Sequence, residues 1–261
     1  MSSYGLKVKW LSVACFELVK DGKHIVTDPF VTLSDNSPCT WEDIEGCDLI
    51  TLSHVHWDHV PDIPALMRKF PGAPLLTGEL SALPLIEWGN LIPQDVWPME
   101  SNLELDFDWV KAKALFGRHT AFGETRVQLL SNLSRKPFCD KAMGDMQILG
   151  TMEYRNFLFT FPDGTKILIW GNDFTPVQIN IVKALKPDIA FIQSTRQLND
   201  LEGYARFVHE SGAKVVIPHH MDLKKPYEEY KPLLKKAEEA IKELSPEVEF
   251  VLPEYGKYVE V

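Results

Sequence analysis

The sequence has few cysteines, and no two of them have metal-binding or redox spacing. Cys15, Cys39, Cys47 and Cys139 are scattered over 261 residues, and none belongs to a C-x-x-C pair. Zinc ribbons and dithiol redox sites usually contain such pairs, so the sequence indicates neither class of site. We therefore expect a reduced protein that resides in the cytoplasm.

The chain also lacks long apolar runs and an excess of positive charge. No apolar stretch approaches the roughly 18 residues that a membrane span needs, and residues 1–5 do not have the layout of a signal peptide. The 27 Lys and Arg residues against 37 Asp and Glu give a net charge of −10. This balance argues against binding to a phosphate backbone. We expect a small-molecule substrate and no nucleic-acid or membrane partner, and a homo-oligomer stays possible.

Metal-ligand side chains are concentrated in one short stretch. Residues 51–60 contain four of them: His54, His56, Asp58 and His59. The apolar run at 47–52 predicts a buried strand before this stretch. Residues 62–70 predict a helix after it, with Asp62 as the N-cap. The four side chains therefore follow the carboxyl end of a strand, where open α/β sheets place their binding sites.

Three later stretches also place ligand-type residues directly after a predicted strand. They contain His119, Asp173 and the pair His219–His220. Strand ends of this kind can meet at one edge of a sheet, so all of these side chains can converge. Imidazole and carboxylate groups suit Zn²⁺, Mn²⁺ or Fe. No cysteine lies in these stretches, which excludes a soft thiolate site.

The order of the predicted elements indicates a single α/β (α+β) domain over residues 1–261. Two hairpins are predicted, at residues 6–30 around the Asp21–Gly22 turn and at residues 154–170. Strands and helices then alternate to residue 251, with Thr175 as the predicted N-cap of the first of these helices, and no linker interrupts the chain. Residues 121–147 show no clean period. We expect two sheets packed face to face, with helices on the outside.

The ligand stretch resembles the His-x-His-x-Asp-His signature of the metallo-β-lactamase superfamily. Within it, the chain most resembles the branch of L-ascorbate-6-phosphate lactonase and related metal-dependent hydrolases. This likeness rests on Trp10-Leu11, Asp28-Pro29, the histidine motif, Gly171-Asn172-Asp173 and Pro218-His219-His220. It implies the four-layer αββα sandwich of the metallo-β-lactamase fold. Two segments differ from the pattern of these relatives. Ser12-Val13-Ala14 stands where they often have Gly-His-Ala, and Asn172-Asp173-Phe174 stands where they have Gly-Asp-Thr. These differences put the substrate in doubt.

The resemblance implies two divalent metal ions, Zn²⁺ or Mn²⁺, with Fe as a further option. The first ion would be bound by His54, His56 and His119, and the second by Asp58, His59 and a downstream histidine. Asp173 would bridge the two ions. The Pro-x-His pattern favours His220 as the downstream ligand; His219 is the alternative, or a residue that contacts substrate. Asp28 either supports the site from behind or simply initiates a turn.

Such a centre predicts a hydrolase for a small ester, lactone or phosphoester. Two cations lower the pKa of a shared water and yield hydroxide near neutral pH, and Asp58 would bind metal and orient that hydroxide. Three alternatives remain: a di-iron oxidoreductase, a nucleic-acid phosphodiesterase, and a non-catalytic binding protein. Metal analysis separates the oxidoreductase from the hydrolase, and activity on generic esters separates both from a binding protein.

Overall fold

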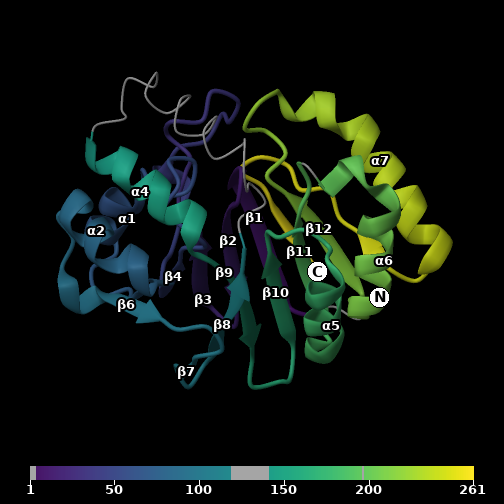
Figure 1. Cartoon of the computed structure of the whole chain (residues 1–261), viewed down its shortest axis with the longest axis horizontal. Helices are drawn as coiled ribbons and strands as arrows, with labels where there is room; N and C mark the ends of the chain where they lie inside the picture. The colour runs from purple at the N-terminus through teal and green to yellow at the C-terminus, as the bar shows by residue number, and fades with distance from the viewer. Residues whose placement is uncertain (1–3, 119–140, 196) are drawn as a thin grey trace.

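The computed structural model describes residues 4–118, 141–195 and 197–261, and its strands form two seven-stranded sheets (Figure 1). The first sheet has the strand order β14-β1-β2-β3-β4-β5-β6. Its strands are β1 (Leu6–Ser12), β2 (Cys15–Lys20), β3 (Lys23–Thr27), β4 (Leu49–Thr51), β5 (Leu75–Gly78), β6 (Val96–Met99) and β14 (Tyr258–Glu260). Strands β14, β1, β2 and β3 are antiparallel, whereas β3 to β6 are parallel.

The second sheet has the strand order β13-β12-β11-β10-β9-β8-β7. Its strands are β7 (Glu104–Asp106), β8 (Lys111–Gly117), β9 (Tyr154–Thr160), β10 (Lys166–Trp170), β11 (Ile189–Gln193), β12 (Val215–His219) and β13 (Glu249–Phe250). It combines an antiparallel half, β7 to β10, with a parallel half, β10 to β13. In both sheets the parallel strands end at a common edge.

Helices cover the outer faces of both sheets, so the predicted αββα sandwich is confirmed (Figure 1). The helices beside the first sheet are α1 (Ile63–Lys69), α2 (Glu79–Gly89) and α4 (Lys141–Met152). Those beside the second sheet are α5 (Pro176–Leu185), α6 (Leu201–Ser211) and α7 (Tyr227–Leu244). Short 3₁₀ turns are η1 (Trp41–Asp43), η2 (Pro93–Asp95) and η3 (Gln197–Asn199). None of the helices in the described ranges is long and apolar enough to cross a membrane.

Apolar side chains fill the space between the two sheets. Phe16 of β2 meets Phe191 of β11 edge to face, with ring centroids 4.9 Å apart. A separate apolar cluster joins Ile50 of β4 to Leu66 of α1 and Met146 of α4. Each such side chain contributes about 1.5–3 kcal/mol when it is fully buried. The two clusters fix β4, and hence the histidine motif that follows it, between the second sheet and the outer helices.

The first predicted hairpin differs from the structure in one respect. A continuous strand up to the Asp21–Gly22 turn was expected, but the chain reverses at Val13-Ala14 and forms two strands, β1 and β2. Asp21 and Gly22 both have positive φ, 52° and 74°, as a two-residue hairpin turn requires. Val13 also has a positive φ, 42°, which is rare for a β-branched residue. Local propensity therefore could not predict the reversal.

The predicted cap of α1 is wrong, whereas that of α5 is confirmed. Asp62 makes no side-chain hydrogen bond to the helix it precedes. Its carboxylate instead accepts hydrogen bonds from the backbone N–H groups of Val31 (2.6 Å) and Thr32 (2.9 Å). Thr175 does cap its helix, in a reciprocal capping box with Gln178. Asp62 thus fixes the loop after β3 rather than the helix end.

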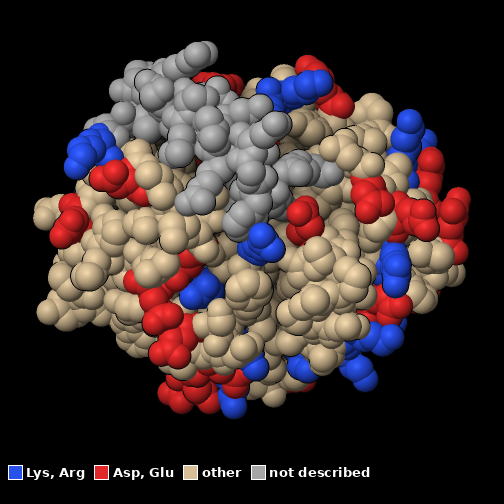
Figure 2. Space-filling view, viewed as in Figure 1, with Lys and Arg blue, Asp and Glu red and all other residues tan. Residues whose placement is uncertain are grey.

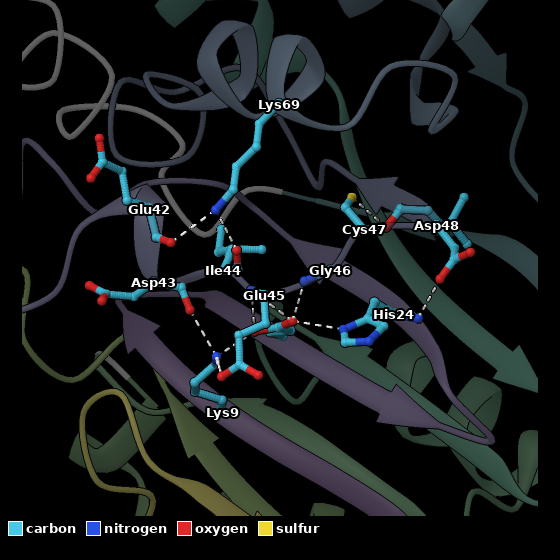
Figure 3. Close-up of polar contacts among 12 residues, drawn as sticks. Lys9, His24, Glu42, Asp43, Ile44, Glu45, Gly46, Cys47, Asp48 and Lys69 are labelled. Atoms are coloured by element: carbon cyan, nitrogen blue, oxygen red, sulfur yellow. Dashed lines mark hydrogen bonds and ion pairs between the residues drawn. The ribbon is translucent and has the colours of Figure 1, made fainter.

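A buried charge cluster fixes the segment between β3 and β4. The Lys9 ammonium is 2% exposed and lies 2.7 Å from the carboxylates of Glu17 and Glu45. It also donates to the carbonyl of Asp43 (Figure 3). Lys69 donates to carbonyls of the same segment from the other side (Figure 3). Burial by itself would raise the pKa of Glu17, but the adjacent Lys9 holds it below its usual range.

Charges of both signs are interspersed over the described part of the face in Figure 2. Acidic side chains gather along the lower edge of this view, where β7 lies in Figure 1. Asp106 in this strand forms an ion pair of 3.4 Å with Lys111. Exposed pairs of this kind contribute little to stability, about 0–1 kcal/mol.

Candidate metal centre

The histidine motif is fastened to the neighbouring strand through Asp28. This residue follows β3, and its carboxylate accepts hydrogen bonds from the backbone N–H of Ser53 (2.6 Å) and from the Ser53 hydroxyl (2.8 Å). The same carboxylate lies 3.0 Å from Nδ1 of His59. Asp28 has a φ of 38°. Of the two roles considered for Asp28, the structure therefore shows the supporting one.

The hydrogen bonds of the first two histidines orient their rings. The Ser53 hydroxyl donates to Asp28 and therefore accepts from Nδ1 of His54 (2.9 Å), which leaves the lone pair on Nε2. Nε2 of His56 donates to the carbonyl of Gln147 (3.1 Å), which leaves the lone pair on Nδ1. Burial lowers the pKa of His56 to about 4. Both rings can thus present a neutral nitrogen to a metal.

Asp58, His59 and His220 form a compact buried group. One ligand atom from each lies within 4.8 Å of the other two. Oδ2 of Asp58 is 3.4 Å from Nε2 of His220 and 3.8 Å from Nε2 of His59. Burial by itself would raise the pKa of Asp58, but the two imidazoles outweigh this and hold it below its usual range. This carboxylate therefore stays ionised at neutral pH.

The two parts of the motif are adjacent. The ring of His54 lies 4.3 Å from that of His56 and 4.1 Å from that of His59, measured between centroids. His59 in turn lies 5.5 Å from His220. Burial by itself would lower the pKa of His59, but the carboxylates of Asp28 and Asp58 raise it. Five of the predicted ligands are therefore together: His54, His56, Asp58, His59 and His220.

The other three predicted site residues are His219, Asp173 and His119. Nε2 of His219 donates to the carbonyl of Trp170 (3.0 Å), and its ring meets that of Phe16 edge to face. His219 therefore lies between the sheets. Asp173 is half-buried after β10 and is not part of the compact group of three. His119 lies outside the described residues.

Three residues of α4 complete the surroundings of His56, and no sequence motif indicates them. Gln147 and Thr151 lie within hydrogen-bond distance of its Nε2. Gly150 lets the helix approach so closely that a Cβ on this residue would be 2.6 Å from the His56 ring. The helix begins in the stretch that showed no clean period, and only its packing on the motif reveals this role.

The donor set fits a divalent transition metal. Hydrogen bonds leave a lone pair on Nε2 of His54 and on Nδ1 of His56, and the Asp58 carboxylate is ionised and buried. Nδ1 of His220 is buried and has no hydrogen-bond partner among the described residues. Imidazole with carboxylate is the ligand combination of Zn²⁺ and related ions. A carboxylate beside a ligand histidine, as Asp28 lies beside His59, commonly orients the ring.

We expect Gly150→Ala to weaken metal binding by His54 and His56 about 10-fold, because the added methyl group displaces the His56 ring. Gly144→Ala is the matched control: it lies on the same helix, and its Cβ would meet nothing within 4 Å. Both substitutions add the same helix propensity. Competition with a chromogenic chelator measures both affinities. Equal Zn²⁺ affinity in the two variants would contradict the role given to α4.

Residues 7–220 match the family described as Beta-lactamase superfamily domain. A metal-dependent hydrolase of Aeropyrum pernix is 37% identical over 70 residues, 27% of this chain and 28% of the relative. Another, of Sulfurisphaera tokodaii, is 34% identical over 111 residues, 40% of this chain and 47% of the relative. The matched part of the chain thus spans less than half the length of either relative.

A solved structure has a similar arrangement over almost the entire chain. It is a metallo hydrolase of the archaeon Ignicoccus hospitalis, with a TM-score of 0.70 and 16% identity. The superposition covers 98% of both chains. At this identity the likeness concerns the fold.

Proposed function

This chain belongs to the β-lactamase superfamily domain family and has the metallo-β-lactamase fold; on that basis we propose that it is a metal-dependent hydrolase with a two-metal centre. The proposed substrates are small esters, lactones or phosphoesters. The observation that carries the proposal is the buried group of Asp58, His59 and His220. It joins the motif after β4 to the segment after β12.

We assign the first ion to His54, His56 and His119, and the second to Asp58, His59 and His220, with Asp173 as the bridge. Ions bound there would lower the pKa of a shared water and polarise the carbonyl or phosphoryl oxygen of the substrate. Asp58 contributes an ionised carboxylate that accepts a hydrogen bond and orients the attacking water. The Asp28 carboxylate lies 3.0 Å from Nδ1 of His59, and burial holds His56 neutral. The resemblance to the lactonase branch favours a lactone as the first substrate to test.

We expect protein purified without chelator to contain about two metal ions per chain, because His54 and His56 lie beside the group of Asp58, His59 and His220. Elemental analysis gives both the ratio and the metal. Hydrolysis of p-nitrophenyl acetate, γ-butyrolactone and bis-p-nitrophenyl phosphate, before and after chelation, gives the reaction class. A ratio near zero that added Zn²⁺ or Mn²⁺ does not raise would contradict the metal centre. Two iron ions with redox activity and no hydrolysis would favour an oxidoreductase.

A further inference from the structure

A second buried acid lies next to the candidate centre but outside its ligand group. Asp222 is 0% exposed and lies two residues after His220. Its Oδ1 accepts a hydrogen bond from the backbone N–H of Val13 (2.9 Å). Its Oδ2 accepts from the hydroxyls of Ser12 (3.2 Å) and Tyr255 (2.9 Å). Hydrogen bonds offset part of the desolvation cost of a buried carboxylate, and three donors bond to this one.

The turn that Asp222 binds also holds His220. The carbonyl of Val13 accepts a hydrogen bond of 2.7 Å from the backbone N–H of His220. Both residues have positive φ, 42° for Val13 and 63° for His220. Non-glycine residues keep this conformation only where the surrounding structure fixes it, and they cluster at functional sites. The carboxylate of Asp222 supplies that restraint on the Val13 side.

Two other segments converge on the same point. The indole N–H of Trp10 donates to the Val13 carbonyl (3.3 Å), and its ring stacks on Tyr255 at 4.3 Å. The side-chain amide of Asn36 donates to the backbone carbonyl of Asp222. The carboxylate and the backbone carbonyl of Asp222 thus join four segments. These are the Ser12–Val13 turn, the loop after β3, the segment after β12 and the segment before β14.

We propose that Asp222 is a positioning residue for the second metal site. By fixing the Ser12–Val13 turn, it fixes the backbone of His220, whose Nε2 then faces Asp58. The inference rests on the proposed function, since it concerns the affinity of that site for its ion. It assigns to Asp222 no contact with the metal or the substrate.

The test is Zn²⁺ affinity of the full-length chain, measured by competition with a chromogenic chelator. We expect Asp222→Asn to weaken the Zn²⁺ affinity of the site about 10-fold. The hydroxyls of Ser12 and Tyr255 donate to Oδ2 of Asp222, and an NH₂ group in that place cannot accept these hydrogen bonds. The matched control is Glu17→Gln, which neutralises an equally buried acid in the Lys9 cluster. We expect that control to lower the Tm of the metal-free protein and leave Zn²⁺ affinity unchanged. Tyr255→Phe, which removes one donor, should weaken Zn²⁺ binding less than Asp222→Asn.

Wild-type Zn²⁺ affinity in Asp222→Asn would overturn this inference and leave the proposed function intact. An equal loss of affinity in Glu17→Gln would also overturn it, because the effect would then follow general destabilisation. If Asp222→Asn does not fold, Tyr255→Phe decides, and unchanged affinity in that variant overturns the inference. A wild-type chain that binds no Zn²⁺ would instead refute the proposed function, and the inference with it.

Discussion

We expect His220→Ala to lose one of the two metal ions and to lower kcat/KM about 10³-fold. Nε2 of His220 is 3.4 Å from Asp58 within the compact group, and alanine removes this donor entirely. A metal ion that polarises the substrate contributes several kcal/mol to the transition state, and about 4 kcal/mol corresponds to a 10³-fold change in rate. Elemental analysis and steady-state kinetics on the hydrolysed ester or lactone measure the two effects.

His219→Ala is the matched control for this variant. It removes an adjacent imidazole whose Nε2 donates to the carbonyl of Trp170. The carbonyl would lose its partner, so we expect a stability loss of about 1–3 kcal/mol with metal content near that of the wild type. If His219→Ala loses the ion and His220→Ala retains it, the assignment of the two histidines is reversed.

We expect Lys9→Met to lower the free energy of unfolding by about 3 kcal/mol, more than 100-fold in the folding equilibrium. Methionine preserves most of the packing but leaves the Glu17 carboxylate buried without its cation. The N–H groups of Glu45 and Gly46 still donate to this carboxylate, which limits the loss. Urea unfolding measures the difference.

The pH dependence of this variant follows from the lowered pKa of Glu17 in the folded protein. A carboxyl with a depressed folded pKa adds stability above its unfolded pKa of roughly 4.3. That contribution is lost as the pH falls through the folded value. The gap between wild type and Lys9→Met should therefore be widest near neutral pH and narrow in acid. Lys7→Met, which removes an exposed ion pair with Glu260, is the control and should change stability by less than about 1 kcal/mol.

The sequence could predict the architecture and the ligand stretch, because both depend on local signals. Hydrophobic periodicity and the Thr175 cap are properties of neighbouring residues, and the spacing of His54 to His59 can be seen without a fold. The contacts that orient the ligands are long-range. Aspartate is a residue type that commonly caps helices, yet the side chain of Asp62 binds a loop 30 residues earlier.

The role of α4 and the reversal at Val13 were hidden for the same reason. Gln147 meets His56 only after α4 packs on the motif. A valine with positive φ contradicts its own propensity, and it is maintained by Asp222, 209 residues away. No local pattern encodes such a pair. Sequence patterns therefore predicted side chains that lie together in the structure, from His54 to His220, but not the long-range contacts that orient them.

A ribosome makes β1 before all the other described strands and its partner β14 after all of them. The two strands pair through Lys7 with Glu260 and Lys9 with Tyr258. At about 5–20 residues per second, roughly 12–50 s pass between their synthesis. During that interval the edge of β1 can pair with another nascent chain, and lysines on an exposed edge oppose such pairing. We therefore expect Lys7 and Lys9 to oppose such pairing until the last described strand is made, after which Lys9 lies over the Tyr258 ring.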